Sequence, residues 1–228
     1  MVPHMVLRAS RFLKILRSQS RYLSFRELIA LVQQVLFKVD NIVIYKKDLY
    51  TDIADLPSPG VAGAFCKGDL QELEATWSRM NHPPWEFMCS VYDNVTDCFV
   101  FKTTDGQIAH ISWIYYKADP NRIIDLRENE AEIKYSLTLP EYRGQGLYSS
   151  ALAHIQHFLM TKGYGRVYIC SYLHNLPSIA GITKAGFEYV TGLKFIRILG
   201  LRCKRRYQGT PITSTRQRGL RRALPIAK

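Results

Sequence analysis

The sequence predicts a mixed α/β domain over residues 41–200, and three observations predict it. Apolar and polar residues alternate from Glu132 to Leu139, as in a strand with one buried face. A turn with Gly144 and Gly146 follows at once, and an amphipathic helix begins directly after it. Elsewhere, β-rich runs and helical patterns follow one another in the order β-α-β-β-β-α-β-α-β-β.

Composition supports a folded core and argues against several other protein classes. Hydrophobic residues make up 47% of the 228 residues, which is enough for a normal core. No apolar run reaches the roughly 18 residues that span a bilayer, and arginines and lysines interrupt any signal-like pattern near the N-terminus. The five cysteines are odd in number and lack CxxC spacing, so we expect reduced thiols and no metal site. These features favour a soluble, cytoplasmic, metal-independent protein.

The net charge of +12 is concentrated at the two ends of the chain. Residues 1–40 have a net charge of +5, residues 41–190 of −4, and residues 191–228 of +11. Basic ends are more typical of solvated tails, or of attachment to an acidic surface, than of a nucleic-acid-binding face. We therefore do not favour nucleic acid as the partner of this protein. Contact of the ends with an acidic partner or with the inner face of the membrane stays an alternative.

The first part of the chain predicts a basic helical extension, a strand and a capped helix. Apolar residues recur at helical spacing over 5–39, within the extension 1–40, and predict a helix that packs on the domain; the alternative is a helix in a membrane interface. Residues 41–50 predict the first strand, and the proline- and glycine-rich stretch 51–68 predicts a loop or broken helix. A helix over 70–80 follows, which Asp69 can cap.

The central part predicts the strands that lead to the glycine turn. Residues 98–102 and 108–117 predict two strands, because Asp105-Gly106 between them suits a tight hairpin turn. An acidic loop follows and leads to the strand that ends at Leu139.

The last part predicts a helix, a strand, a second helix and a hairpin. The helix after the glycine turn stops at Lys162–Gly165, residues 166–170 predict a strand, and residues 175–184 predict a short helix. Residues 187–190 and 193–199 predict two strands joined in a hairpin at the intervening Thr-Gly pair. The basic segment 201–228 is expected to be a disordered tail.

The glycine turn predicts an anion site. A helix that begins at such a turn leaves backbone N–H groups without partners, and its dipole favours negative charge at that end. Arg143 adds a fixed positive charge beside Gly144 and Gly146. We therefore expect this turn to bind a phosphate or pyrophosphate.

Two motifs together resemble the GCN5-related N-acetyltransferase (GNAT) superfamily. The first is Arg143-Gly-Gln-Gly-Leu-Tyr148, preceded by Pro-Glu-Tyr, and the second is the segment from Asn175 to the Gly186-Phe187 pair. The likeness is strong over residues 132–190, and the order of the elements extends it to 41–200. It implies a mostly antiparallel, twisted sheet of six or seven strands, flanked by helices, in which the fourth and fifth strands splay apart.

The resemblance implies an acyl-CoA donor, usually acetyl-CoA. Its pyrophosphate would bind the turn, and its pantetheine arm would pair with the end of the preceding strand and with the Asn-led helix. An alternative role for Asn175 is a helix N-cap, and the two roles can coexist. The cofactor-binding residues that the resemblance implies are Leu137, Thr138, Leu139, Arg143, Gly144, Gln145, Gly146, Leu147, Tyr148, Asn175 and Ser178.

Two residues depart from the family pattern. Tyr148 replaces a glycine or alanine, so we expect its ring to turn into the core or to line the cofactor cleft. Ile182 stands where many members have a tyrosine that protonates the departing thiolate. Tyr148 is therefore the first candidate for that acid, with Tyr172, Tyr189 or solvent as alternatives.

A carboxylate usually serves as the base in this family. Glu132 is the first candidate, because it has the same strand parity as Thr138; its alternative role is a solvated residue at the strand end. His110 is the second candidate, although a single histidine in a strand is more often structural.

The sequence favours an N-acyltransferase, most simply an N-acetyltransferase, that acts on a primary amine such as an amino sugar or amino acid. Three alternatives stay open: an acyl carrier protein as donor, guided by the basic ends; a non-catalytic CoA-binding module, since Tyr148 and Ile182 are atypical; and association with RNA or the ribosome through the tail.

Overall fold

The structure is a computed structural model that describes residues 37–49, 58–80, 83–198 and 201–207. The expected N-terminal helix up to residue 36 and the tail from residue 208 lie outside the described residues. The chain divides into two compact units. The larger unit contains Val43–Thr191, and the smaller unit contains Gly192–Gly209 together with residues up to Ile42. The boundary between the units therefore falls within two strands.

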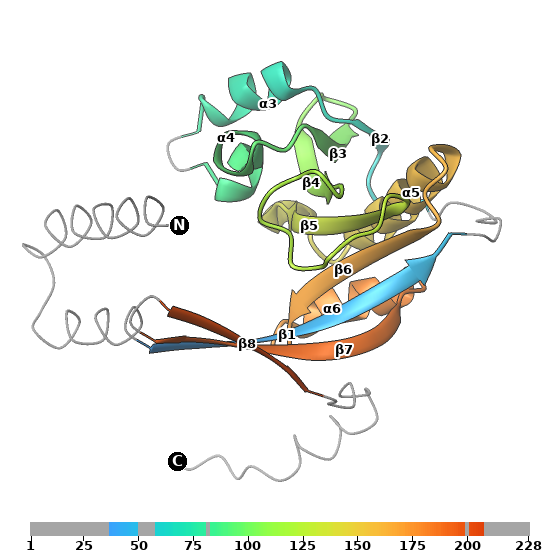
Figure 1. Ribbon diagram of the computed structural model, residues 1–228. Helices are drawn as coiled ribbons and strands as arrows, with labels where there is room; N and C mark the ends of the chain where they lie inside the picture. The colour runs from blue at the N-terminus through green and yellow to red at the C-terminus, as the bar shows by residue number, and fades with distance from the viewer. Residues whose placement is uncertain (1–36, 50–57, 81–82, 199–200, 208–228) are drawn as a thin grey trace, which may run out of the picture. The chain divides into compact units, whose positions relative to one another are not determined.

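Seven of the eight strands of the sheet contribute to the larger unit, in the order β2-β3-β4-β5-β6-β1-β7 (Figure 1). The neighbours β2·β3, β3·β4 and β4·β5 are antiparallel, whereas β5 and β6 are parallel. The strands are β1 (Phe37–Asp48), β2 (Gly63–Lys67), β3 (Asp97–Thr103), β4 (Ile108–Tyr115), β5 (Glu130–Thr138), β6 (Arg166–Tyr172) and β7 (Glu188–Ile198).

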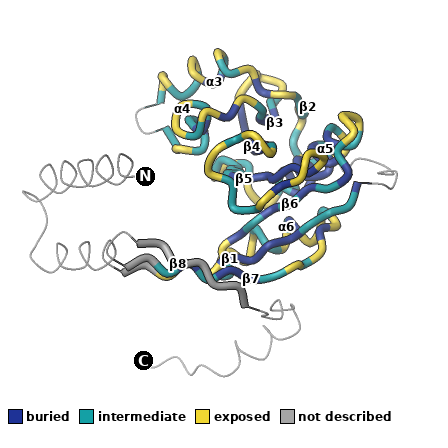
Figure 2. Tube along the Cα trace, viewed as in Figure 1, coloured by how far each residue is buried: buried dark blue, intermediate teal, exposed yellow. Residues whose placement is uncertain are grey.

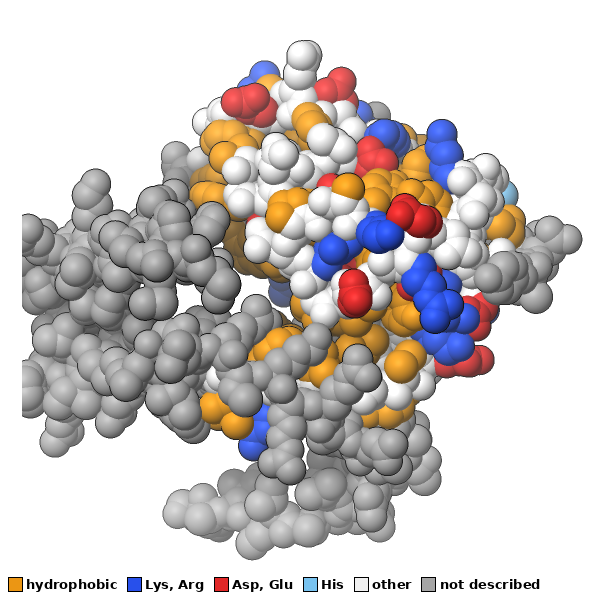
Figure 3. Space-filling view, in the orientation of Figure 1, with side chains coloured by type: hydrophobic (Ala, Val, Ile, Leu, Met, Phe, Trp, Pro, Cys, Tyr) orange, Lys and Arg blue, Asp and Glu red, His pale blue; other side chains and the backbone are white. Residues whose placement is uncertain are grey.

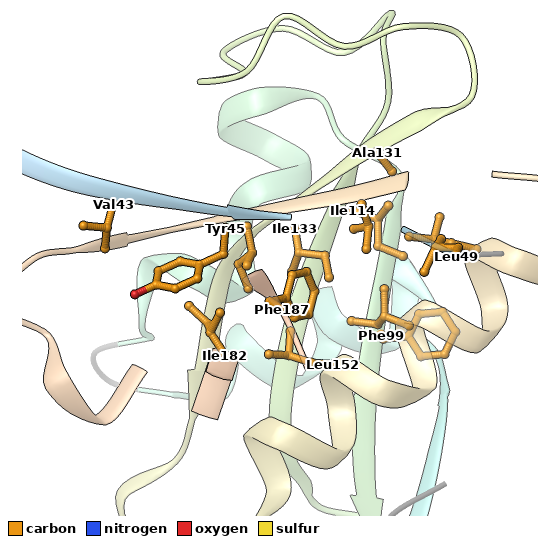
Figure 4. Close-up of a cluster of buried hydrophobic side chains, with 14 residues drawn as sticks. Val43, Tyr45, Leu49, Phe99, Ile114, Ala131, Ile133, Leu152, Ile182 and Phe187 are labelled. Atoms are coloured by element: carbon orange, nitrogen blue, oxygen red, sulfur yellow. The ribbon is translucent and has the colours of Figure 1, made fainter. Parts of the chain in front are cut away.

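Helices cover both faces of this sheet. Neighbouring residues of β4 alternate between two core clusters: Ile114 packs with α5 and α6, whereas Trp113 and Tyr115 pack with α3, η1 and α4. Figure 4 shows Leu152 and Ile182 within the first cluster. The helices are α3 (Leu70–Trp77), η1 (Trp85–Met88), α4 (Cys89–Asp93), η2 (Pro140–Tyr142), α5 (Leu147–Thr161) and α6 (Leu176–Lys184).

Burial explains why the central strands form where they do. Every residue of β4 is buried, as expected for a strand that is covered on both faces (Figure 2). The cap predicted for α3 is confirmed, because the Asp69 carboxylate accepts a hydrogen bond from the Gln71 N–H at 2.8 Å.

The smaller unit contains a hairpin. The second half of β7 pairs antiparallel with β8 (Leu201–Tyr207), from Gly192 opposite Tyr207 to Ile198 opposite Leu201. The sequence-based hairpin at Thr191-Gly192 is therefore wrong, because β7 runs through this pair without a turn. The expectation of a disordered tail from residue 201 is also wrong as far as Tyr207. Basic residues in β8 hid the alternation by which a strand is recognised.

Four other elements differ from the sequence prediction. Residues 37–39 belong to β1 and not to the N-terminal helix, since β1 begins at Phe37. β2 lies inside the stretch expected to be a loop, where neighbouring glycine and proline obscured five residues that pair with β3. The short helices η1 and α4 were not predicted, because they are too short to show a helical period.

Charged side chains of opposite sign lie close together on the face in Figure 3. Lys67 pairs with Asp97 at 2.7 Å, and the guanidinium of Arg166 lies between Asp48 and Glu130. The pairs of Lys67 with Asp97 and of Arg166 with Asp48 are partly exposed, so each stabilises the fold by about 1 kcal/mol or less, whereas Glu130 is buried.

Candidate functional site

The glycine turn has an open outer side. Gly144 has φ of +79° and Gly146 has φ of +78°, and a Cβ atom built on either would meet no atom within 4 Å. Gly146 is the N-cap of α5 but supplies no side-chain bond, and the first turn of α5 has no acidic residue. The Gly60 N–H donates to the Gln145 carbonyl at 2.9 Å and holds the turn from behind. The start of α5 is thus uncapped by side chains and has space beside it for an anion.

Arg143 lies directly beside this space. Its side chain is exposed, and its Nε donates to the Thr138 carbonyl at 3.0 Å. This bond ties the guanidinium to the end of β5. A positive charge is therefore held between β5 and the start of α5.

The strands β5 and β6 separate before they end. Their parallel pairing runs from Glu130 opposite Arg166 to Ile133 opposite Ile169, whereas β5 continues to Thr138. A β-bulge lies at the point of separation, where Tyr135 has φ of +51° and the register with β4 shifts. The predicted contact residues Leu137, Thr138 and Leu139 follow this bulge, so they lie on or directly after the separated part of β5.

The start of α6 lies close to the same region. Asn175 is the N-cap of α6, and its Oδ1 accepts a hydrogen bond from the Ser178 N–H at 3.3 Å. The N-cap role that the sequence suggested is thus present. The Ser178 hydroxyl lies 3.3 Å from the Tyr148 hydroxyl of α5, so α5 and α6 meet at these two side chains.

The Tyr148 ring packs closely against Gly181 of α6. A Cβ atom added at Gly181 would lie 2.5 Å from Cδ1 of the ring, so only a glycine leaves room for it. The ring also packs on the core cluster of α5 and α6. Its hydroxyl interacts with Ser178 and Ser136, and burial raises the pKa of Tyr148 to about 12. The ring has turned inward, and its hydroxyl points to the separated part of β5.

A family model described as the acetyltransferase (GNAT) family matches residues 68–187, more than half of the chain. The chain belongs to the GNAT family. The matched region includes the glycine turn, the separated strands and α6, and GNAT enzymes generally use an acyl-CoA. Among curated proteins, no sequence match was found.

Solved structures agree with this fold. A GNAT acetyltransferase from Colwellia psychrerythraea is 16% identical, with a TM-score of 0.47, and the match covers 80% of this chain and 62% of that one. A Drosophila protein has a TM-score of 0.52 at 10% identity, over 77% of this chain and 57% of that one. A glucosamine N-acetyltransferase region of a fungal multi-domain β-N-acetylglucosaminidase has a TM-score of 0.51 at 12% identity, over 75% of this chain and 22% of that one. This chain thus spans less than two thirds of the length of each.

The GNAT tyrosine position on α6 is apolar here. Ile182 is fully buried in the core cluster and has no proton to give. Of the alternative tyrosines, Tyr172 is exposed and stacks on His174, and Tyr189 packs edge-on against Tyr45. Tyr148 is the one of these three whose hydroxyl lies beside Ser178.

Glu132 lies on the other face of the sheet. It is opposite Tyr115 of β4, in the cluster of α3 and η1, whereas Thr138 is opposite His110, which has the parity of the α5 face. The expected shared face of Glu132 and Thr138 is therefore wrong, because the bulge at Tyr135 inverts the alternation.

The Glu132 carboxylate is buried and bonded. Its Oε2 accepts hydrogen bonds from the N–H groups of Ile123 at 3.0 Å and Ile124 at 3.1 Å, and Oε1 lies 3.9 Å from the Cys170 thiol. Burial raises the pKa of Glu132. These bonds fix the loop before β5. The alternative role of a solvated residue at the strand end is wrong, because Glu132 is fully buried, and the role of base stays a prediction.

His110 connects several polar side chains inside the sheet. Its Nδ1 lies 2.7 Å from the Thr138 hydroxyl and its Nε2 lies 2.8 Å from the Ser112 hydroxyl. Ser112 in turn donates to the Ser136 hydroxyl at 2.7 Å. Burial lowers the pKa of His110 to about 3, so the ring is uncharged and a weak base at neutral pH.

Ser112 and Ser136 were not predicted from the sequence, although a signal was present. Ser112 lies two residues from His110 in β4, and Ser136 lies two residues from Thr138 in β5, so each polar pair shares one face of its strand. Polar side chains that share a face of neighbouring strands can hydrogen-bond one another. Lys134 was also not predicted, and its buried ammonium lies 4.4 Å from the ring centroids of both Tyr115 and Tyr135.

The described residues lack two kinds of feature. No group of three or more histidine, cysteine or acidic side chains there could hold a metal ion. In the same residues, no helix has the length and apolar character needed to cross a membrane.

Proposed function

We propose that this protein transfers an acyl group from an acyl-CoA, with acetyl-CoA as the first candidate, to a primary amine. The observation that supports this most directly is the open glycine turn of Gly144 and Gly146, next to a β5 edge that β6 leaves unpaired, within a GNAT domain. A CoA thioester supplies the activated acyl group for direct attack by the amine.

The turn and β5 would bind the two ends of the donor. The first N–H groups of α5 and the Arg143 guanidinium suit a pyrophosphate. The backbone of Leu137 to Leu139 suits an extended amide-containing arm, because a separated strand can accept another strand-like ligand. The amide of Asn175 and the hydroxyl of Ser178 lie at the start of α6 as further polar contacts.

We propose Tyr148 as the acid that protonates the departing sulfur. Its hydroxyl comes from α5 but lies beside α6, where Ile182 offers no proton. With a pKa of about 12 it is protonated at neutral pH and can donate. The neighbouring Ser136 hydroxyl lowers that pKa, so it stabilises the anion that remains after the proton leaves.

For the amine, we propose that its proton leaves to water. Glu132 is fully buried and holds the N–H groups of Ile123 and Ile124, so its contacts support a structural role rather than that of a base. The acceptor is proposed as a small primary amine, such as an amino sugar or amino acid.

The test is release of free thiol from acetyl-CoA in the presence of a panel of amino sugars and amino acids. Amine-dependent thiol release supports the proposal. Tight CoA binding without release for any amine would instead favour a non-catalytic CoA-binding module. Release from an acyl carrier protein but not from CoA would identify the carrier as donor.

A further inference from the structure

A buried lysine side chain is enclosed by aromatic rings at the point where β5 leaves β6. Lys134 is only 6% exposed, and its Nζ lies 4.4 Å from the ring centroids of both Tyr115 and Tyr135. Nζ also donates a hydrogen bond to the Asn121 carbonyl at 2.5 Å. Burial lowers the pKa of Lys134, but the Glu132 carboxylate opposes this shift and favours the ammonium form. Cation–π attraction and a charge-assisted hydrogen bond thus hold the ammonium between two rings and a carbonyl, which we call the lysine cage.

Other side chains hold the lysine cage in place. The Asp93 carboxylate accepts hydrogen bonds from the Tyr115 hydroxyl at 2.7 Å and from the Asn121 amide at 2.9 Å. Trp85 of η1 packs edge-on against the Tyr135 ring, with 4.3 Å between the ring centroids. Parts of β4, η1, α4 and the loop before β5 therefore meet around the ammonium group.

The contact between Lys134 and Tyr135 depends on the β-bulge. In a regular strand, neighbouring side chains point to opposite faces of the sheet. Here Tyr135 has φ of +51°, and between two successive pairs with β4 the strand β5 has two residues where β4 has one. Lys134 is opposite Trp113, and Tyr135 packs against the same core cluster, so the two neighbours share one face. A left-handed φ is unfavourable for tyrosine, and the cation–π contact that favours it is lost if the strand becomes regular.

The bulge lies where the separation of β5 from β6 begins. The last parallel pair is Ile133 opposite Ile169, although both strands continue beyond it. A regular β5 could continue this pairing, and β6 would then occupy the edge that the proposed function assigns to the donor arm. The lysine cage thus favours the strand geometry that leaves this edge open.

We propose that Lys134 is a positioning residue that holds the bulge at Tyr135 and so keeps the β5 edge open for the extended arm of the acyl donor. This inference rests on the proposed function. Lys134 acts through Tyr135, and its ammonium group stays in the lysine cage. Its loss should therefore weaken the binding of the pantetheine arm at the β5 edge, but not the binding of the pyrophosphate at the glycine turn.

The test compares Lys134→Met with Lys117→Met. Both variants lose one positive charge, but Lys117 is exposed and pairs with Glu128 at 2.5 Å, outside the lysine cage. Titration calorimetry would use CoA and adenosine 3′-phosphate 5′-diphosphate, which is CoA without its pantetheine arm. We expect Lys134→Met to weaken CoA binding about tenfold or more with an unchanged Kd for the nucleotide, and Lys117→Met to change neither. An unchanged CoA affinity in folded Lys134→Met, or an equal loss for both ligands, would overturn the inference.

A rescue experiment distinguishes the bulge from the charge. Glycine adopts a positive φ without strain, so Tyr135→Gly should keep the bulge without the lysine cage. In this background, Lys134→Met should cost little further CoA affinity, and another loss of about tenfold would contradict a role through the bulge.

A second readout needs no ligand. The backbone ¹³C chemical shifts of Tyr135 should indicate a left-handed φ in the wild type and a mainly extended φ in Lys134→Met. Left-handed shifts in both proteins would overturn the inference. A wild-type protein that binds CoA no more tightly than the nucleotide would overturn the proposed donor site, and this inference with it, whatever the shifts of Tyr135 indicate.

Discussion

The packing of Tyr148 on α6 predicts an unusual response to the substitution Gly181→Ala. Inside a helix, alanine is normally about 1 kcal/mol more favourable than glycine. Here the new Cβ would lie 2.5 Å from Cδ1 and 3.0 Å from Cε1 of the ring, so ring or helix must move by about 1 Å. Overpacking of this kind costs about 1–3 kcal/mol. We therefore expect a net loss of up to about 2 kcal/mol in the free energy of unfolding.

The same substitution should also impair catalysis, because the displaced ring takes its hydroxyl away from Ser178. Denaturant unfolding and thiol release would be measured for Gly181→Ala, Tyr148→Ala and the double variant. Without the ring, Gly181→Ala should stabilise the protein by about 1 kcal/mol. If Gly181→Ala stabilises the wild type by that amount and leaves turnover unchanged, the ring does not pack against α6 as described.

Further predictions concern the acid and the buried carboxylate. Tyr148→Phe should lower kcat about 100-fold with little change in CoA affinity, measured by thiol release and calorimetry; equal kcat would exclude Tyr148 as the acid. Glu132→Gln should keep most activity, because one amide oxygen can accept from both Ile123 and Ile124; a loss of several orders of magnitude in a folded variant would return Glu132 to the role of base. Since the folded pKa of Glu132 is raised, its contribution to stability is largest below its unfolded pKa and decreases as pH rises toward the folded value. The free energy of unfolding of Glu132→Gln minus that of the wild type should therefore increase as the pH rises from the unfolded pKa to the folded pKa of Glu132. A difference that does not change with pH would contradict the raised pKa.

The sequence predicted the part of the fold that depends on local patterns. Alternation in β5, the Asp105-Gly106 turn and the Asp69 cap are all local, and each predicted element is present. The position of β1 between β6 and β7 could not be predicted, because it depends on pairing between residues more than 100 positions apart. The hairpin prediction was wrong because Gly192 is a strand residue here.

The site could be predicted as a set of residues but not as a geometry. The glycine turn and the N-cap of α6 follow from short motifs, so they were found directly. The bulge at Tyr135 leaves no such signal, and it moved Glu132 to the opposite face from Thr138. The hydrogen bonds from His110 through Ser112 to Ser136 join β4 and β5, and no single segment of sequence contains them.

The most direct test of the central claim, that the glycine turn binds CoA, compares Gly146→Ala with Gly163→Ala. The two glycines have φ of +78° and +82°, and a Cβ atom at either would meet nothing within 4 Å, so both substitutions should cost the same 1–2 kcal/mol or so of backbone strain. Gly146 begins α5, whereas Gly163 follows its end. Titration calorimetry with CoA should show at least a tenfold weaker Kd for Gly146→Ala and a wild-type Kd for Gly163→Ala. Equal CoA affinity in both folded variants would contradict the account.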